Sequence, residues 1–371
     1  MRVSSGSVVG RGLLLAVGVS LLATARAADV GITATTQPPQ VVFTRLAGVH
    51  LRQEARVQLQ PGDNRFLVDF GRYEIDPATL DLRVLEPAEG VQVMGRDFSP
   101  RQPGQVVFLL RAAQPTNARL SVNYALKGLE SEVSYSILLA PQSQTLALEA
   151  QVALRNNSKQ PLPQAQVLLP GGHVLGTGLE LGQSVQQRFF RCEAIPYQVR
   201  YLYDNTRYKD SVRAILKLER GGSSDFDKLA LPAGKVKVFA PTAGNAPGFV
   251  AEATAKYAPA HEALELDLGT VPDITILRTK LRGDQANART DVYKKLALFD
   301  LDEEYELEVE NHRAAPVTIA FDEHIPGEWQ ITKANVPWQK LDAGTVELTL
   351  KLEPGQKTKM NYVVKRLNVE P

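Results

Sequence analysis

The alternation of polar and apolar residues within 305–329 constrains the fold more than any other feature of the sequence. From Tyr305 to Val309 every second residue is apolar, and glutamates stand between them. This is the two-residue period of a strand with one buried face. Asn311 opens a turn, and Pro316 opens a second alternating run. The stretch therefore predicts a strand–turn–strand unit of an antiparallel sheet.

Short alternating runs of the same kind recur along most of the chain, separated by turns rich in Gly, Pro, Asn and Asp. The runs lie at residues 57–70, 80–84, 91–93, 120–124, 133–137, 146–152, 199–203, 264–268, 274–276, 346–352 and 362–364. Short strands at such near-regular spacing are typical of a sandwich. We therefore expect an all-β protein of tandem antiparallel β-sandwich domains, immunoglobulin-like in type, behind a cleaved signal peptide.

Residues 1–27 have the pattern of that signal peptide. Arg2 and Arg11 precede an apolar run at 12–23, which is too short to span a bilayer comfortably. Small residues then predict cleavage between Ala27 and Ala28, and a retained N-terminal anchor is the alternative. No later run approaches about 18 uninterrupted apolar residues. We therefore expect a periplasmic or secreted protein with no transmembrane span in its mature chain.

The 371 residues exceed the usual size of one domain, so several domains are expected. Turn-rich stretches place boundaries near residues 115 and 222. The predicted segments are a signal peptide (1–27), a flexible lead-in (28–40), an N-terminal β domain (41–115), a middle β-sandwich (116–222) and a C-terminal β-sandwich (223–371).

Two of the predicted strand–turn–strand units share their spacing. Asn156 precedes Pro161 by the same five positions that separate Asn311 from Pro316, and each unit ends at a Pro-Gly pair. We interpret this as an internal repeat of one sandwich element in two separate domains. The alternative is that two hairpins converged on the turn residues that all hairpins favour.

Three segments in this order and spacing, 152–158, 231–238 and 311–329, resemble a bacterial domain-of-unknown-function family related to mucoidy inhibitor A proteins. The resemblance runs from Leu120 to the C-terminus, about two-thirds of the chain. It implies β-sandwich lobes and frequent export, with no established reaction or catalytic set. The chain departs from the family in two ways. Ser131 stands where many relatives have Trp, and 91–120 leaves no room for their long helical hairpin.

The charges of the chain are nearly balanced, with 42 basic and 41 acidic residues. Such a balance argues against a global attraction to nucleic acid or anionic lipid, although locally basic patches are compatible with it. We therefore expect no nucleic-acid partner.

Motifs that carry chemistry are missing from the sequence. It has no G-x-S-x-G nucleophile elbow and no Gly-rich phosphate loop, and its five histidines form neither H-x-H nor H-E-x-x-H. Carboxylate pairs for hydrolysis depend on spatial separation, which the sequence does not show. We predict no catalytic residue, no metal site and no cofactor.

Neither of two acidic clusters in the sequence has the pattern of a metal site. In 322–324, an Asp-Glu-His run, alternation predicts that Asp322 and His324 lie on a solvated strand face, where two ligands leave a zinc shell unfilled. Residues 300–304 carry four carboxylates without the loop spacing of a calcium motif, which predicts a solvated charged turn.

Cys192 is the only cysteine, so no intramolecular disulfide can form. It follows two phenylalanines and an arginine, a setting that favours a packed, inert thiol over a nucleophile or a dimer link.

The segment 188–209 is the best candidate for binding, because it is rich in tyrosine and arginine. Tyrosines stack on sugars or bury against a partner, and arginines engage anionic groups. The candidate residues are Tyr197, Tyr201, Tyr203, Tyr208, Arg188, Arg191, Arg200 and Arg207. The alternative is that Tyr201 and Tyr203 belong to the core and the arginines to its wet face.

The sequence favours an exported, non-enzymatic β-sandwich protein that binds a protein or a glycan in the cell envelope. A secreted carboxylate-dependent hydrolase of glycans or peptides is the alternative, and a purely structural spacer is a third reading. Under the first hypothesis, substitutions at Glu323 and His324 are expected to leave the fold intact.

Overall fold

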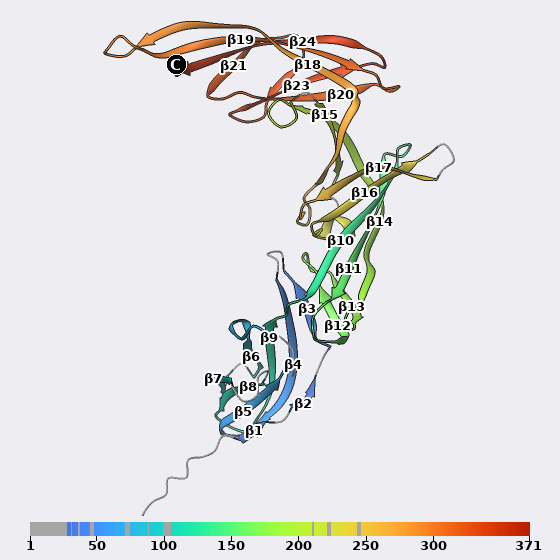
Figure 1. The fold of residues 1–371 in the computed structure, drawn as a ribbon, viewed down its shortest axis with the longest axis vertical. Helices are drawn as coiled ribbons and strands as arrows, with labels where there is room; N and C mark the ends of the chain where they lie inside the picture. The colour runs from blue at the N-terminus through green and yellow to red at the C-terminus, as the bar shows by residue number, and fades with distance from the viewer. Residues whose placement is uncertain are drawn as a thin grey trace, which may run out of the picture. The chain divides into compact units, whose positions relative to one another are not determined.

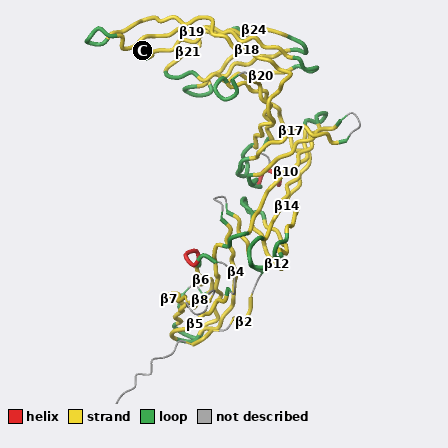
Figure 2. The backbone as a smooth tube through the Cα atoms, in the orientation of Figure 1, coloured by secondary structure: helices red, strands yellow, loops and turns green. Residues whose placement is uncertain are grey.

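The computed structural model describes residues 28–30, 32–35, 38–44, 48–70, 75–87, 89–98, 105–209, 211–220, 224–242 and 246–371. The predicted signal peptide, residues 1–27, lies outside the described residues. Within them almost every regular element is a strand, and the exceptions are the 3-10 helix η1 (Pro77–Thr79) and the short helix α1 (Asp225–Lys228) (Figures 1 and 2). The all-β prediction is confirmed. No helix in this part of the chain is long and apolar enough to cross a membrane.

The strands follow one another with little else between them. They are β1 (Ala28–Val30), β2 (Ile32–Thr35), β3 (Gln40–Phe43), β4 (Val49–Leu59), β5 (Gly62–Asp69), β6 (Asp81–Glu86), β7 (Val91–Phe98), β8 (Gln105–Ala112), β9 (Thr116–Ala125), β10 (Leu129–Ala140), β11 (Thr145–Asn156), β12 (Leu162–Leu168), β13 (Val174–Leu179), β14 (Ser184–Asp204), β15 (Ser211–Leu218), β16 (Gly234–Pro241), β17 (Pro247–Ala255), β18 (Leu264–Thr290), β19 (Leu296–Asn311), β20 (Val317–His324), β21 (Glu328–Ala334), β22 (Trp338–Lys340), β23 (Thr345–Leu352) and β24 (Lys357–Val369).

The chain packs as two compact units, and neither is one continuous segment. Of the described residues, unit 1 comprises those within 28–35, 53–70 and 81–122, and unit 2 those within 38–52, 75–80 and 123–371. This division differs from the predicted domains, because β4 and β9 each contribute residues to both units.

Unit 1 contains a four-stranded sheet in the order β1-β5-β8-β7. Its antiparallel register places Phe66 opposite Phe108, with ring centroids 6.5 Å apart. Both rings are buried, together with Leu59 and Leu120 from β4 and β9. Alternation in these strands therefore supplies a core of its own to unit 1.

In unit 2 the long strand β14 serves two ladders in succession. It pairs with β11 as far as Pro196, and from Tyr197 onward it pairs with β15. Its last residues, from Tyr201 to Asp204, also pair in parallel with β20, so β14 belongs to both the middle and the C-terminal β-sandwich segments predicted from the sequence.

The hairpin of β16 and β17 belongs with the middle segment. β16 pairs in parallel with β10, with Ser134 opposite Lys235. Gly234 permits this approach, because a Cβ there would lie 2.5 Å from the carbonyl oxygen of Val133. The predicted boundary at residue 222 therefore falls before strands that complete the middle sheet.

The expected internal repeat is present in unit 2. In the first copy β11 lies between β10 and β14, and in the second β19 lies between β18 and β24. In each copy the strand after the turn joins a parallel neighbour, β3 for β12 and the end of β14 for β20. The two copies therefore share strand order as well as sequence spacing.

The same hydrogen bonds close the turn of each copy. The side-chain amide of Asn156 donates to the carbonyls of Gln160 and Leu179, and that of Asn311 donates to the carbonyls of Ala315 and Glu353. Each side-chain oxygen accepts the backbone N–H two residues ahead. Both asparagines are completely buried. Two buried amides with matching partners favour a repeat over convergence on common turn residues, but both copies lie in unit 2 and not in two separate domains as expected.

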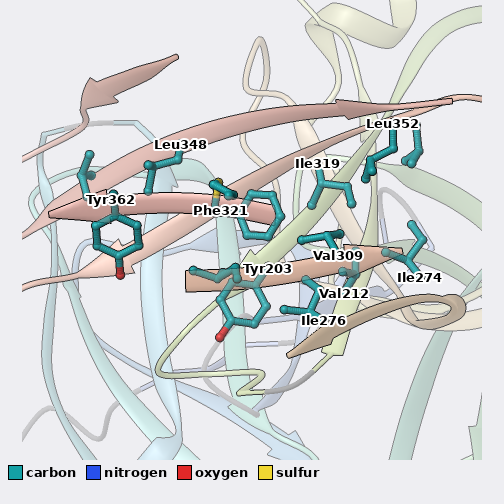
Figure 3. Packing of buried hydrophobic residues seen from close by; sticks show 14 of the residues in the cluster. Tyr203, Val212, Ile274, Ile276, Val309, Ile319, Phe321, Leu348, Leu352 and Tyr362 are labelled. Carbon is teal, nitrogen blue, oxygen red and sulfur yellow. The ribbon is translucent and has the colours of Figure 1, made fainter. Parts of the chain in front are cut away.

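The second copy is built around a large apolar core (Figure 3). Phe321 of β20 packs against Tyr203 of β14, with ring centroids 5.6 Å apart. Ile319 and Leu348 face the same interior from β20 and β23. The alternation read from the sequence thus produces a sandwich-like packing of apolar strand faces.

Candidate functional site

The predicted tyrosine–arginine segment lies almost entirely on β14, and its residues do not form one patch. Arg188 and Arg191 lie on the part of β14 that pairs with β11. Tyr201 and Tyr203 lie on the part that pairs in parallel with β20. The segment is therefore divided between the two copies of the repeat.

Tyr203 is buried in the core of the second copy, which leaves its ring no face for a ligand (Figure 3). Tyr201 and Tyr208 are half-buried, and guanidinium groups lie over their rings. The Arg313 carbon Cζ lies 4.7 Å from the ring centroid of Tyr201, and Arg213 lies 5.2 Å from that of Tyr208. Tyr203 is thus a core residue, as the alternative reading of the sequence expected.

The four candidate arginines all have acidic partners. Arg188 pairs with Glu149 at 3.5 Å, and Arg191 pairs with Glu193 at 2.6 Å. Arg207 reaches Asp204 at 3.6 Å. Arg200 contacts Asp322 at 3.2 Å and also bonds Glu347. Arg188, Arg191 and Arg207 remain more than half exposed and are the members still open to an anionic partner.

The densest polar cluster, which sequence reasoning missed, surrounds Glu323 of β20. Glu323 is completely buried, and Arg278 of β18 grips both carboxylate oxygens, with Nε–Oε1 3.1 Å and Nη2–Oε2 3.0 Å. Asn205 donates to Oε2 at 2.8 Å. Arg278 also donates to the hydroxyl of Tyr362, at 3.1 Å. We call Arg278, Glu323, Asn205 and Tyr362 the buried polar cluster.

Burial and the ion pair act in opposite directions on the two charged groups of this cluster. Burial raises the pKa of Glu323, and the charge and hydrogen bonds of Arg278 oppose that rise. Burial would lower the pKa of Arg278, but the neighbouring Glu323 carboxylate raises it on balance. Arg278 also lies over the ring of Tyr305, with its Cζ atom 4.0 Å from the centroid. A bidentate guanidinium–carboxylate pair in this setting is a strong and geometrically specific interaction.

One sequence signal pointed to this cluster. Arg278 follows Ile274 and Ile276 at the same two-residue period, which places a cation on the inward face of a strand. A buried cation requires a partner, and Glu323 on β20 is in the equivalent inward position. No local rule identifies which carboxylate pairs with which arginine, because β18 and β20 meet only in the fold.

Asp204, His324 and Thr345 form a second polar chain beside the cluster. His324 Nε2 lies 3.2 Å from Asp204 Oδ2, and its Nδ1 lies 3.1 Å from the Thr345 hydroxyl. Burial would raise the pKa of Asp204, but hydrogen bonds led by the Arg207 N–H lower it on balance. Carboxylate, imidazole and hydroxyl are the residue types of a hydrolytic triad. The Thr345 side chain, however, is buried, so its oxygen is not presented to a substrate.

The prediction that Asp322 lies on a solvated strand face is wrong. Its side chain is only 15% exposed and lies opposite Glu347 of β23, with Arg200 bridging the two carboxylates. Burial raises the pKa of Asp322, and the nearby Arg200 acts against that rise. The Asp322–Glu347 pair brings together carboxylates from two separate strands, as the hydrolase alternative requires.

The acidic run at 300–304 also differs from its prediction. It is part of β19 and not a turn, and Asp300 and Glu303 are buried. Arg289 pairs with Asp300 at 2.9 Å, and Lys280 pairs with Glu303 at 2.6 Å. Among the described residues, no group of three or more His, Cys, Asp or Glu side chains is placed to hold a metal ion.

Cys192 lines a cleft of about 580 Å³ that also contains Arg220 and Phe226. Burial raises the pKa of the Cys192 thiol. Because the thiolate is the reactive form, this setting lowers the reactivity of the sulfur.

Comparison with known proteins assigns no relative to the chain. No protein-family model matches it, and no curated protein does. The functional argument therefore rests on the geometry of the described residues.

Proposed function

We propose that this chain is an exported, non-enzymatic protein of tandem immunoglobulin-like β-sandwich modules, acting as a binding or scaffolding protein in the cell envelope. The observation that carries the proposal is the state of its acid–base groups. Glu323 is fully buried, and its carboxylate oxygens are taken up by Arg278 and Asn205. A general acid or base must reach the substrate directly or through one water. Glu323 thus has the environment of a structural clamp.

Export and family membership are parts of the same proposal. The signal peptide at 1–27 predicts a mature chain that begins at Ala28, which N-terminal sequencing of the exported protein tests. The resemblance of 152–158, 231–238 and 311–329 to the mucoidy inhibitor A-related family supports an envelope role. The repeat of the Asn-turn element supports a modular architecture, because each copy repeats the same strand order.

The binding surface is assigned to the exposed arginines of β14, Arg188 and Arg191. The experiment is capture of envelope glycans and proteins by the purified chain, compared with an Arg188→Gln/Arg191→Gln variant. The matched control is Lys351→Gln/Lys235→Gln, which removes equal charge at exposed sites elsewhere. Loss of capture in the first variant alone supports the proposal. Equal capture by both variants removes this surface from it.

A secreted carboxylate-dependent hydrolase is the second candidate, favoured by the Asp322–Glu347 pair. It requires that turnover of a glycan or peptide disappear in Asp322→Asn while the fold is retained. Circular dichroism and a panel of polymeric substrates together decide this. Turnover with that dependence overturns the non-enzymatic proposal.

A further inference from the structure

The turn between β18 and β19 presents two apolar side chains to solvent. Val292 is 91% exposed and Tyr293 is 80% exposed, the largest exposures among the large hydrophobic residues of the described chain. The two strands run side by side to this turn (Figure 1). Two adjacent apolar side chains exposed to this degree make the tip of this hairpin a candidate contact surface.

The turn is held in one conformation. The Asp291 carboxylate accepts the backbone N–H groups of Tyr293 and Lys295, at 2.8 and 2.9 Å. The Asp291 N–H donates to the carbonyl of Lys295, and the Lys294 N–H donates to the carbonyl of Asp291. Lys294 adopts a left-handed φ of 61°, which costs energy for a residue other than glycine. The exposure of Val292 and Tyr293 therefore follows from a turn whose conformation is fixed by hydrogen bonds.

Two cations stand beside the apolar pair. Lys294 and Lys295 are exposed, and neither has an ion-pair partner within the described residues. The one acidic side chain within 287–296, Asp291, is occupied by the amides of the turn. Arg289 is held by Asp300. The surface of the turn is consequently apolar and locally basic, although the whole chain is nearly neutral.

We propose that this turn, residues 291–295, inserts into the interface of an anionic lipid bilayer as a peripheral contact. Tyrosine is favoured at the headgroup level of membranes, and lysines are attracted to anionic leaflets. A long lysine side chain keeps its ammonium at the headgroups while its stem lies along apolar surface. Five residues are too few for the roughly 800 Å² per partner of a stable protein interface. Contact with a lipid surface has no such threshold, because its strength scales with the buried apolar area and with the attraction of cations to anionic lipid.

The experiment is flotation of the full chain with vesicles of phosphatidylcholine, with and without phosphatidylglycerol. Binding is expected with the anionic vesicles and is expected to weaken as salt rises. Val292→Ser/Tyr293→Ser is expected to lower the partition coefficient at least about tenfold. Lys294→Gln/Lys295→Gln is expected to lower it about fivefold per lysine.

Matched controls separate the turn from general stickiness and charge. Phe249→Ser removes another exposed apolar residue, 62% exposed, and Lys351→Gln/Lys235→Gln removes two other exposed lysines. Both controls are expected to float like the unaltered chain. Thermal unfolding of each variant confirms that the fold is retained.

Fluorescence quenching measures how deeply residue 293 enters the bilayer. Tyr293→Trp is expected to be quenched by brominated anionic lipid beyond the quenching of the two native tryptophans. The proposal is overturned by failure to float with anionic vesicles, by flotation that the turn variants leave unchanged, or by equal losses in the controls. Self-association that depends on Val292 and Tyr293, without vesicle binding, assigns the turn to a second copy and also overturns it.

Discussion

Arg278 and Glu323 form a two-point ion pair in which the carboxylate is completely removed from solvent. The pair joins β18 to β20 through the interior of the second repeat copy. Its geometry reverses the expectation that Glu323 is dispensable for the fold.

Breaking the buried pair from one side is expected to be costly. Arg278→Met alone should lower the free energy of unfolding by about 3–5 kcal/mol, because it leaves the completely buried Glu323 carboxylate uncompensated. Glu323→Leu alone should cost less, because the Arg278 side chain that it leaves unpaired is 25% exposed. The double variant should recover most of that loss. Urea unfolding measures all three, and Lys351→Met, which breaks an exposed pair with Glu353, should change stability by no more than about 1 kcal/mol. A loss in the double variant equal to the sum of the two single losses would contradict the coupling.

The two repeat asparagines should behave alike. Asn156→Ala and Asn311→Ala each remove a fully buried amide that donates to two backbone carbonyls, at a cost of about 1–3 kcal/mol. The control is Asn157→Ala, an exposed neighbour, expected within about 0.5 kcal/mol of the unaltered chain. A large loss at one asparagine and none at the other would show that the copies do not share this support.

Asp204 and Asp322 should give opposite pH dependences. Hydrogen bonds hold the folded-state pKa of Asp204 below its ordinary value, so its charge stabilises the fold above the ordinary pKa of about 3.9. That stability is lost as pH falls through the lowered folded pKa. Burial raises the pKa of Asp322, so its charge costs stability above the raised folded pKa, and the cost vanishes in acid.

The corresponding test is urea unfolding from about pH 3 to about pH 7. Asp204→Asn is expected to be less stable than the unaltered chain at neutral pH, with the difference shrinking as the solution becomes acidic. Asp322→Asn is expected to be more stable at neutral pH. Asp225→Asn, at a 95% exposed side chain, should follow the unaltered chain throughout. The same sign for the first two variants would refute the assignment.

Gly234 should tolerate no side chain. A Cβ would meet the Val133 carbonyl oxygen at 2.5 Å, so Gly234→Ala must push β16 away from β10, at a cost of about 1–3 kcal/mol. Gly176→Ala is the control, because no heavy atom lies within 4 Å of its added Cβ. Hydrogen exchange in β16 locates the effect, and equal protection in both variants would exclude it.

The sequence by itself determined the strands and the repeat. Alternation with a two-residue period is a local property, and it predicted that Leu307 and Val309 point inward and that Asn311 begins a turn. The matching spacing of Asn156 and Asn311 predicted two copies of one element, because the same turn imposes the same residues wherever it occurs.

Only the tertiary structure decided which side chains meet. Asp322 contacts Arg200 because β20 pairs with β14, which lies more than a hundred residues away along the chain. Glu323 contacts Arg278 because β18 and β20 face the same core. The sequence allowed Tyr203 to be either a core residue or a ligand-binding residue. The parallel pairing of β14 with β20 places it in the core. Burial and charge pairing are properties of partners distant in sequence, and a two-residue period carries no information about partners.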